Sequence, residues 1–114
     1  NIKNNHNGHQ NLGCIIFNKN KIYAFGINQY NIDYKYKSLH AEVDALLYLK
    51  NQEKKCKIDI VVFRINNSHK YCNAKPCIHC IQNIRRTLKR KNYKLHGNRC
   101  WYTNENGSLE YIKI

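Results

Sequence analysis

Two short segments contain residue types that could do chemistry together, and one expected strand separates them. Residues 39–42 read Leu-His-Ala-Glu, and residues 75–80 read Lys-Pro-Cys-Ile-His-Cys. Cys77 and Cys80 are three residues apart in the first turn of an expected helix, so their sulfur atoms lie on one face and can hold a zinc ion at about 2.3 Å. His40, at the start of another expected helix, offers a third ligand. This set of side chains predicts a zinc site.

Glu42 is the residue that could make such a site catalytic. Three protein ligands leave the fourth tetrahedral position open, which is typical of catalytic rather than structural zinc. Zinc lowers the pKa of a bound water towards ~7, and the two expected helix N-termini favour thiolates and hydroxide. Glu42 lies two residues after His40, and a nearby carboxylate that does not bind the metal can carry protons. We therefore interpret Glu42 as a general acid and base.

A structural zinc site is the main alternative. The cysteine pair and Cys72 could be closed into a four-ligand site by one of three residues: His69, His79 or Cys100. Such a protein would be a binding module, but the pairing of His-Ala-Glu with Pro-Cys-x-x-Cys favours the catalytic site. A thioredoxin-like role is disfavoured, because that motif follows a βαβ start near the N-terminus. His79 is expected to be an exposed helix residue, and the other cysteines are expected to be small apolar residues in or near strands: Cys14, Cys56 and Cys100.

The strands are predicted from apolar runs and turn residues. Residues 12–18 and 21–27 predict an antiparallel hairpin. The nearly continuous apolar run 58–65 predicts a central strand covered on both faces. Residues 100–103 and 108–112 flank an Asn-Gly turn and predict a second hairpin. The sheet is thus expected to have five strands.

Helical spacing predicts two helices. Residues 39–51 follow Ser38 as the cap and have an apolar stripe of Leu39, Val43, Leu46 and Leu47. Residues 77–91 have Pro76 at the first turn and a stripe of Ile78, Ile81, Ile84 and Leu88. The element order predicts a three-layer α/β/α domain with a mixed sheet of five strands and a C-terminal antiparallel hairpin. Residues 12–114 form this domain, and the polar segment 1–11 is expected to be poorly ordered.

Length and composition exclude several classes of protein. A chain of 114 residues forms one domain, which excludes separate cofactor and substrate domains. No run approaches the ~20 apolar residues of a membrane span, so no membrane partner is expected. No signal peptide is visible, and six cysteines without one favour reduced thiols and a cytoplasmic location.

The net charge of +13, from 20 Lys and Arg against 7 Asp and Glu, has two interpretations. It could attract polyanions such as RNA, in which case binding would depend on salt. An AT-rich coding sequence would raise the Lys content without any such partner. The densest cationic cluster lies late in the second expected helix, where cations also complement the helix dipole: Arg85, Arg86, Lys89, Arg90, Lys91 and Lys94.

The paired motif resembles the signature of the zinc-dependent cytidine and deoxycytidylate deaminase superfamily, His-x-Glu and Pro-Cys-x-x-Cys. The similarity extends over nearly the whole chain. It implies a cytidine deaminase-like fold and Zn²⁺ held by His40, Cys77 and Cys80. It also implies that Glu42 shuttles protons while water attacks C4 of cytosine or C6 of adenine and ammonia leaves. Asn28 and Ala41 would then contact the substrate.

Features of several branches of this superfamily are combined here. A histidine ligand is similar to that of deoxycytidylate deaminases, tRNA adenosine deaminases and polynucleotide cytosine deaminases. Tyr30 stands where nucleoside deaminases have a ribose-binding carboxylate. The short C-terminal hairpin resembles the nucleoside branch and some toxin-like deaminases that attack nucleic acid.

We expect a cytoplasmic zinc hydrolase that converts cytosine to uracil in a nucleoside or, preferentially, a nucleotide such as deoxycytidylate. The first alternative is a nucleic-acid-editing deaminase that acts on cytosine or adenine in RNA or single-stranded DNA. The second is a non-enzymatic, zinc-stabilised nucleic-acid-binding module. The sequence leaves open whether identical chains form a homo-oligomer.

Overall fold

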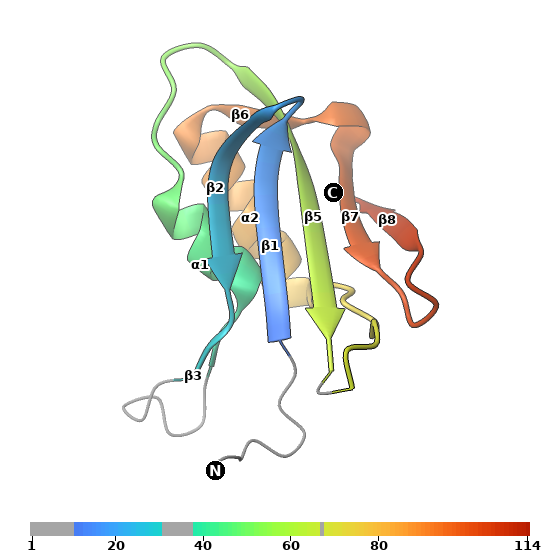
Figure 1. The fold of residues 1–114 in the computed structure, drawn as a ribbon. Coiled ribbons are helices and arrows are strands. Elements are labelled where there is room, and N and C mark those ends of the chain that lie inside the picture. The colour runs from blue at the N-terminus through green and yellow to red at the C-terminus, as the bar shows by residue number, and fades with distance from the viewer. Residues whose placement is uncertain (1–10, 31–37, 67) are drawn as a thin grey trace.

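The computed structural model describes residues 11–30, 38–66 and 68–114 (Figure 1). The segment expected to be poorly ordered lies outside the described residues, apart from Asn11, which begins the first strand. The expected first hairpin is confirmed, since β1 (Asn11–Asn18) and β2 (Lys21–Ile27) pair in antiparallel fashion.

Six strands form one mixed sheet centred on β5 (Cys56–Ile65). The order across the sheet is β2, β1, β5, β7 (Arg99–Thr103) and β8 (Leu109–Lys113). β5 is antiparallel to β1 and parallel to β7, and β7 and β8 form the expected C-terminal hairpin. The remaining strand, β6 (Tyr93–Leu95), pairs with the start of β5. The sheet therefore has one strand more than the five we expect, because β6 is too short to stand out in the sequence.

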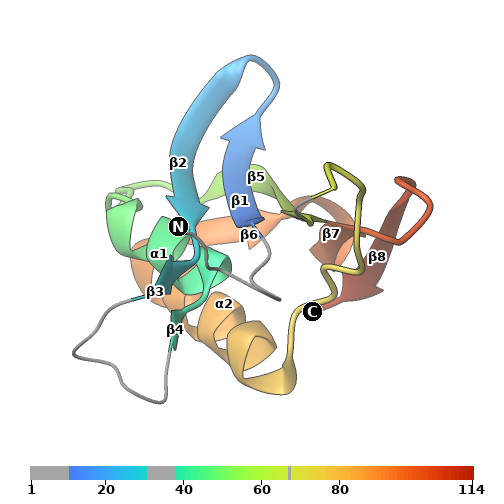
Figure 2. The ribbon, with the colours of Figure 1, turned by 60° about the horizontal axis from the view of Figure 1, so that its bottom comes forward.

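Two α-helices, α1 (Ala41–Tyr48) and α2 (Ile78–Lys91), lie on the same face of the sheet (Figure 2). The expected mixed α/β architecture is confirmed. The described residues supply two of its three expected layers, because no helix among them covers the other face of the sheet. No helix in this part of the chain is long and apolar enough to cross a membrane. A 3-10 turn, η1 (His96–Asn98), precedes β7. The strands β3 (Gln29–Tyr30) and β4 (Ser38–Leu39) form a small separate sheet before α1.

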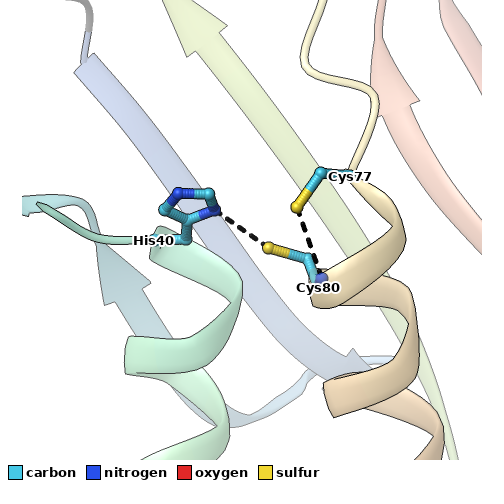
Figure 3. Close-up of side chains that lie close together, drawn as sticks. All are labelled: His40, Cys77 and Cys80. Carbon is cyan, nitrogen blue, oxygen red and sulfur yellow. Dashed lines mark hydrogen bonds between the residues drawn. The ribbon is translucent and has the colours of Figure 1, made fainter. Parts of the chain in front are cut away.

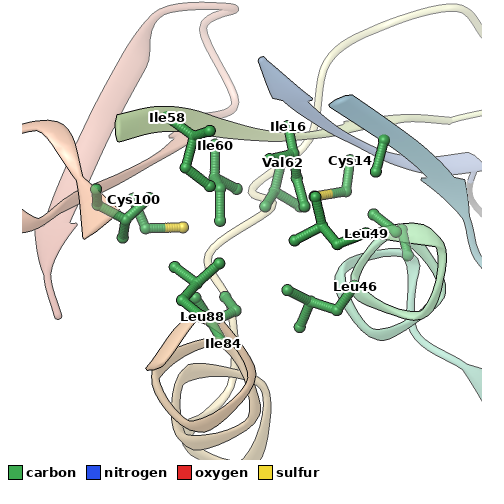
Figure 4. Close-up of a cluster of buried hydrophobic side chains, with 14 of the residues drawn as sticks. Cys14, Ile16, Leu46, Leu49, Ile58, Ile60, Val62, Ile84, Leu88 and Cys100 are labelled. Atoms are coloured by element: carbon green, nitrogen blue, oxygen red, sulfur yellow. The ribbon is translucent and has the colours of Figure 1, made fainter. Parts of the chain in front are cut away.

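The hydrophobic core lies between the sheet and the two helices (Figure 4). Buried side chains of β1, β5 and β7 meet buried side chains of α1, of its C-cap residue Leu49 and of α2: Cys14, Ile16, Ile58, Ile60, Val62, Cys100, Leu46, Leu49, Ile84 and Leu88. Along β5 the residues of this set are every second one, as the period of a strand requires. The core thus fixes which face of β5 points towards the helices.

The opposite face of the sheet is less covered. Residues in register on five neighbouring strands form an apolar row across it: Phe25, Ile15, Val61, Trp101 and Tyr111. The outer members, Phe25 and Tyr111, are 50% and 46% exposed. The expectation that the central strand is covered on both faces is therefore wrong, since only its helix-facing side is fully buried.

The predicted helical stripes are correct for some of their residues and wrong for others. Leu46, Ile84 and Leu88 are buried as expected, whereas Leu47 and Ile78 are 65% and 61% exposed. The first helix is also shorter than predicted and ends at Tyr48. Leu47 lies between the buried residues Leu46 and Leu49, so the surface still covers this part of the chain. It is exposed because its side chain is about 100° from that of Leu46 around the helix axis.

A glycine on β2 lets α1 approach the sheet closely. A Cβ atom on Gly26 would lie 2.3 Å from the backbone nitrogen of Ala45 and 2.4 Å from the backbone oxygen of Ala41. The buried side chain of Asp44 adds a second tie, because its Oδ2 accepts a hydrogen bond of 3.1 Å from the backbone nitrogen of Ile27. The start of α1 is therefore held against the end of β2.

A lysine at the end of α2 ties the two helices together. Lys91 Nζ donates hydrogen bonds of 2.8 and 2.7 Å to the carbonyl oxygens of Leu46 and Leu49. Carbonyl groups at a helix C-terminus lack intrahelical partners, and these bonds supply them. The C-terminal ends of α1 and α2 thus meet at one end of the domain, and their N-termini meet at the other.

Candidate metal centre

The N-termini of α1 and α2 bring three metal-binding side chains together (Figure 3). His40 is the N-cap of α1, Cys77 is the N-cap of α2, and Cys80 lies in the first turn of α2. Ser38, the expected cap, instead belongs to β4, and Pro76 precedes α2 rather than starting it. The prediction that both motif segments lie at helix N-termini is confirmed.

The distances between these side chains fit a single metal ion. His40 Nδ1 lies 3.0 Å from Cys80 Sγ, and the Cys80 backbone nitrogen donates a hydrogen bond of 3.4 Å to Cys77 Sγ. The three ligand atoms lie within 4.8 Å of one another. Tetrahedral zinc with bonds of about 2.0–2.3 Å separates its ligand atoms by roughly 3.4–3.8 Å. One nitrogen and two sulfur donors at this spacing are suited to Zn²⁺.

The protonation of Cys80 depends on what the site holds. Burial and the nearby carboxylate of Glu42 raise the pKa of the Cys80 thiol well above its ordinary value. A bound cation favours the thiolate and opposes both effects, because only the deprotonated sulfur is a metal ligand. Metal binding at this centre is therefore coupled to the loss of a proton.

Glu42 lies beside the ligands without belonging to them. It is only 2% exposed, and it is not part of the group of three ligand side chains. Its Oε1 is buried and has no hydrogen-bond partner among the described residues. Leaving a buried carboxylate oxygen unpaired costs free energy. The position of this atom therefore indicates that its hydrogen-bond donor comes from outside the described residues.

A cavity of about 140 Å³ connects Glu42 with the ligands. It lies between the ends of three strands and the N-termini of the two helices. Its lining residues come from those strand ends, from both helices and from the segment before α2: Leu12, Asn28, Arg64, His40, Glu42, Cys77, Ala74 and Lys75. The cavity thus places a small ligand next to both the metal centre and Glu42.

Of the two residues expected to contact a substrate, one lines this cavity. Asn28 lies there, and its Oδ1 accepts a hydrogen bond of 3.0 Å from the backbone nitrogen of Leu12. This bond holds the side chain at the open end of the hairpin, where β1 begins and β2 ends. Ala41 is fully buried and packs in the core. As the first residue of α1, Ala41 has a backbone N–H without an intrahelical acceptor, and this group is the one available to a ligand. A substrate contact of Ala41 stays a prediction.

The other cysteines and histidines in the described part of the chain lie outside the ligand group. Burial raises the pKa of the thiols of Cys14 and Cys100, of the latter to about 12, as expected for apolar core residues. His79 is exposed on α2, also as expected. None of the residues considered for a closed structural site joins the group: His69, Cys72, His79 and Cys100. The geometry therefore favours a centre with three protein ligands.

Sequence reasoning missed Arg64 as a cavity residue. It lies one residue before the end of β5, where a charged residue ordinarily meets solvent. Its place in the strand is nevertheless in phase with Ile60 and Val62, which are completely buried under the helices. This phase was the available signal, because it puts the side chain on the helix-facing side of the sheet.

Comparison with known families agrees with this geometry. Residues 2–95 match the family described as the cytidine and deoxycytidylate deaminase zinc-binding region. Searches among curated proteins and solved structures found no match. The matched residues include the three ligands and Glu42, while the C-terminal hairpin lies beyond them. Because the match covers most of the chain, this chain belongs to the cytidine and deoxycytidylate deaminase zinc-binding family.

Proposed function

We propose that this chain is a zinc-dependent hydrolase that converts cytosine to uracil in a nucleoside or a nucleotide. The observation that carries the proposal is the buried, unpaired Oε1 of Glu42 in the same cavity as His40 and Cys77. A structural zinc site requires no such carboxylate. Six cysteines, none of them in a disulfide, favour a reducing compartment such as the cytoplasm.

The volume of the cavity supports cytosine over adenine. An engineered cavity of ~150 Å³ in another protein takes up one benzene molecule. A cavity of about 140 Å³ is therefore matched to a single six-membered ring, as in a pyrimidine.

The roles of the side chains follow from their positions. His40, Cys77 and Cys80 would hold zinc, which when bound supplies a Lewis acid that activates water at neutral pH. Glu42 would accept a proton from the attacking water and deliver it to the departing amino group, so that ammonia leaves and uracil remains. The cavity walls would hold the ring so that its C4 faces Glu42. General acid and base catalysis of this kind is worth roughly 10²- to 10⁴-fold in rate.

Ammonia release tests this proposal directly. The zinc-loaded protein is incubated with cytosine and adenine nucleosides, nucleotides and short oligonucleotides, and we expect turnover of cytosine compounds. Glu42→Ala should keep its zinc and its fold but lose at least ~10²-fold in rate. Glu53→Ala, which changes an exposed glutamate, is the matched control and should behave as the unmodified protein. Unchanged turnover by Glu42→Ala would contradict the mechanism.

A polynucleotide deaminase is the second candidate, and one surface favours it. Four cations of α2 are exposed on the same helix: Arg85, Arg86, Lys89 and Arg90. If they bind a nucleic-acid backbone, the affinity for an oligonucleotide should fall steeply with salt, with a slope set by the number of phosphates neutralised. Replacing all four with Gln should then abolish oligonucleotide deamination. A variant that deaminates mononucleotides normally, with a shallow salt dependence in the unmodified protein, would exclude this candidate.

A further inference from the structure

Arg64 presents a buried nitrogen for which the described protein offers no partner. Its Nε is inaccessible to solvent and makes no hydrogen bond, while the residue as a whole is partly exposed and lines the cavity. Arg99 Nε is in a similar position, but that guanidinium lies 5.5 Å from the ring centre of Trp101 and 5.6 Å from that of Tyr111. Among the described residues Arg64 has no such aromatic neighbour and no ion pair. Arg64 Nε therefore lacks a hydrogen-bond acceptor among the described residues.

Glu42 lines the same cavity but does not pair with Arg64. Its own Oε1 is unpaired, and no ion pair joins the two side chains. Burying a polar atom of a charged group without a partner costs free energy. An unpaired carboxylate oxygen and an unpaired guanidinium nitrogen on two residues that line one cavity therefore indicate a ligand that serves both residues. Such a ligand has a hydrogen-bond donor at the Glu42 end and an acceptor or an anion at the Arg64 end.

The charge around the cavity favours an anion. Lys75 also lines it, is exposed and belongs to the segment that leads into α2. Two cations thus lie at a cavity that holds a single ring, and a planar guanidinium with several donors is suited to phosphate oxygens. A neutral carbonyl oxygen of the base would use only one donor of Arg64.

We propose that Arg64, assisted by Lys75, binds a phosphate group of the substrate, so that the substrate is a phosphate ester of a cytosine nucleoside rather than the free nucleoside. This inference rests on the proposed function, because it assumes that the ring occupies the cavity beside Glu42. The phosphate could belong to a mononucleotide or to the backbone of an oligonucleotide, and the experiment distinguishes these sources.

The test compares three substrates in three variants. Values of kcat/KM are measured for cytidine, for a cytosine nucleoside 5′-monophosphate and for a short single-stranded oligonucleotide with one cytosine. Arg64→Gln removes the charge at similar length, and Arg64→Lys restores it without the planar fork. Lys55→Gln, which removes an exposed cation between α1 and β5, is the control. Thermal melting and zinc content establish that each variant is folded and loaded. Calorimetric titration with the monophosphate measures binding independently of turnover.

We expect Arg64→Gln to lower the ratio of kcat/KM for the phosphate ester to that for cytidine by roughly 10- to 100-fold, as for the loss of hydrogen bonds to a charged group. Arg64→Lys should recover part of this ratio, and Lys55→Gln should leave it unchanged. A mononucleotide source is indicated if the 5′-monophosphate carries the effect, and a backbone source if only the oligonucleotide does. An equal loss for cytidine and its phosphate esters would overturn the inference while leaving the deaminase intact. Binding of the monophosphate that depends on Arg64, without turnover of any substrate, would overturn the deaminase alone.

Discussion

Gly26→Ala should weaken the metal centre although Gly26 does not contact it. The added Cβ would lie 2.3 Å from the backbone nitrogen of Ala45 and 2.4 Å from the backbone oxygen of Ala41, about 1.1 Å short of ordinary contact at 3.4 Å. Backbone atoms cannot rotate away as a side chain would, so α1 must move from the sheet by about 1 Å. His40 and Glu42 move with it, away from Cys77 and Cys80 on α2. Overpacking of this kind costs about 1–3 kcal/mol, and a misplacement of ~1 Å can cost 10²-fold in rate.

The prediction is therefore a joint loss of stability and zinc affinity, measured by urea unfolding and by competition with a chromophoric zinc chelator. Gly13→Ala is the matched control. There the added Cβ meets the ring of Phe63 at 2.2–2.9 Å, on the face of the sheet away from the helices. That side chain can move, so we expect unchanged zinc affinity. Equal zinc affinities for both variants and the unmodified protein would refute the link between helix position and metal binding.

Three further predictions concern individual side chains. Cys77→Ala and Cys80→Ala should each lose zinc by elemental analysis, whereas Cys72→Ala, outside the ligand group, should keep one zinc per chain. Lys91→Met should lower the free energy of unfolding by about 1.5–3 kcal/mol, because it removes two hydrogen bonds from an ammonium, and the exposed Lys89→Met should have little effect in the same urea titration. Burial raises the pKa of Cys100 from 9.0 to about 12. The folded protein therefore holds this proton where the unfolded chain releases it, and stability should fall as the pH rises from about 9 towards 12. This fall should be shallower in Cys100→Ala, and an identical pH profile would contradict the assignment.

The elements that the sequence predicts well are those whose pattern is local. Both hairpins and both helices follow from turn residues and from spacing, and the two motif segments lie at helix N-termini as their order along the chain indicates. Periodicity does not show how far a partner surface extends, which is why Ile78 is exposed at a position that matches a buried stripe. Periodicity also does not show which face of the sheet a helix covers. Two helices on the same face therefore give the same sequence pattern as one helix on each face.

Side chains around the metal centre also show that a local pattern predicts some residues and not others. His40, Glu42 and the cysteines were identified by chemistry and spacing, because these residue types are informative wherever they lie. The importance of Asp44 and Arg64, in contrast, is visible only from their positions in the fold. The first is buried against the end of β2, and the second continues the buried phase of β5 into the cavity. A charged residue that continues the buried face of a strand can be recognised only when it is known which face of that strand is buried. That depends on how the strands pair in the sheet, which the local sequence does not show.

The way α1 and α2 are joined explains why metal, fold and catalysis should be coupled in this domain. At their C-terminal ends Lys91 links the helices through two hydrogen bonds. At their N-terminal ends the direct link is the contact of 3.0 Å between His40 and Cys80, which zinc would replace with bonds to a common ion. Glu42 is the second residue of α1, so anything that separates the N-termini also moves this carboxylate, the proton carrier we propose, relative to the metal centre. Free energy released on binding zinc would thus stabilise the helix pair at the end where the proposed reaction takes place.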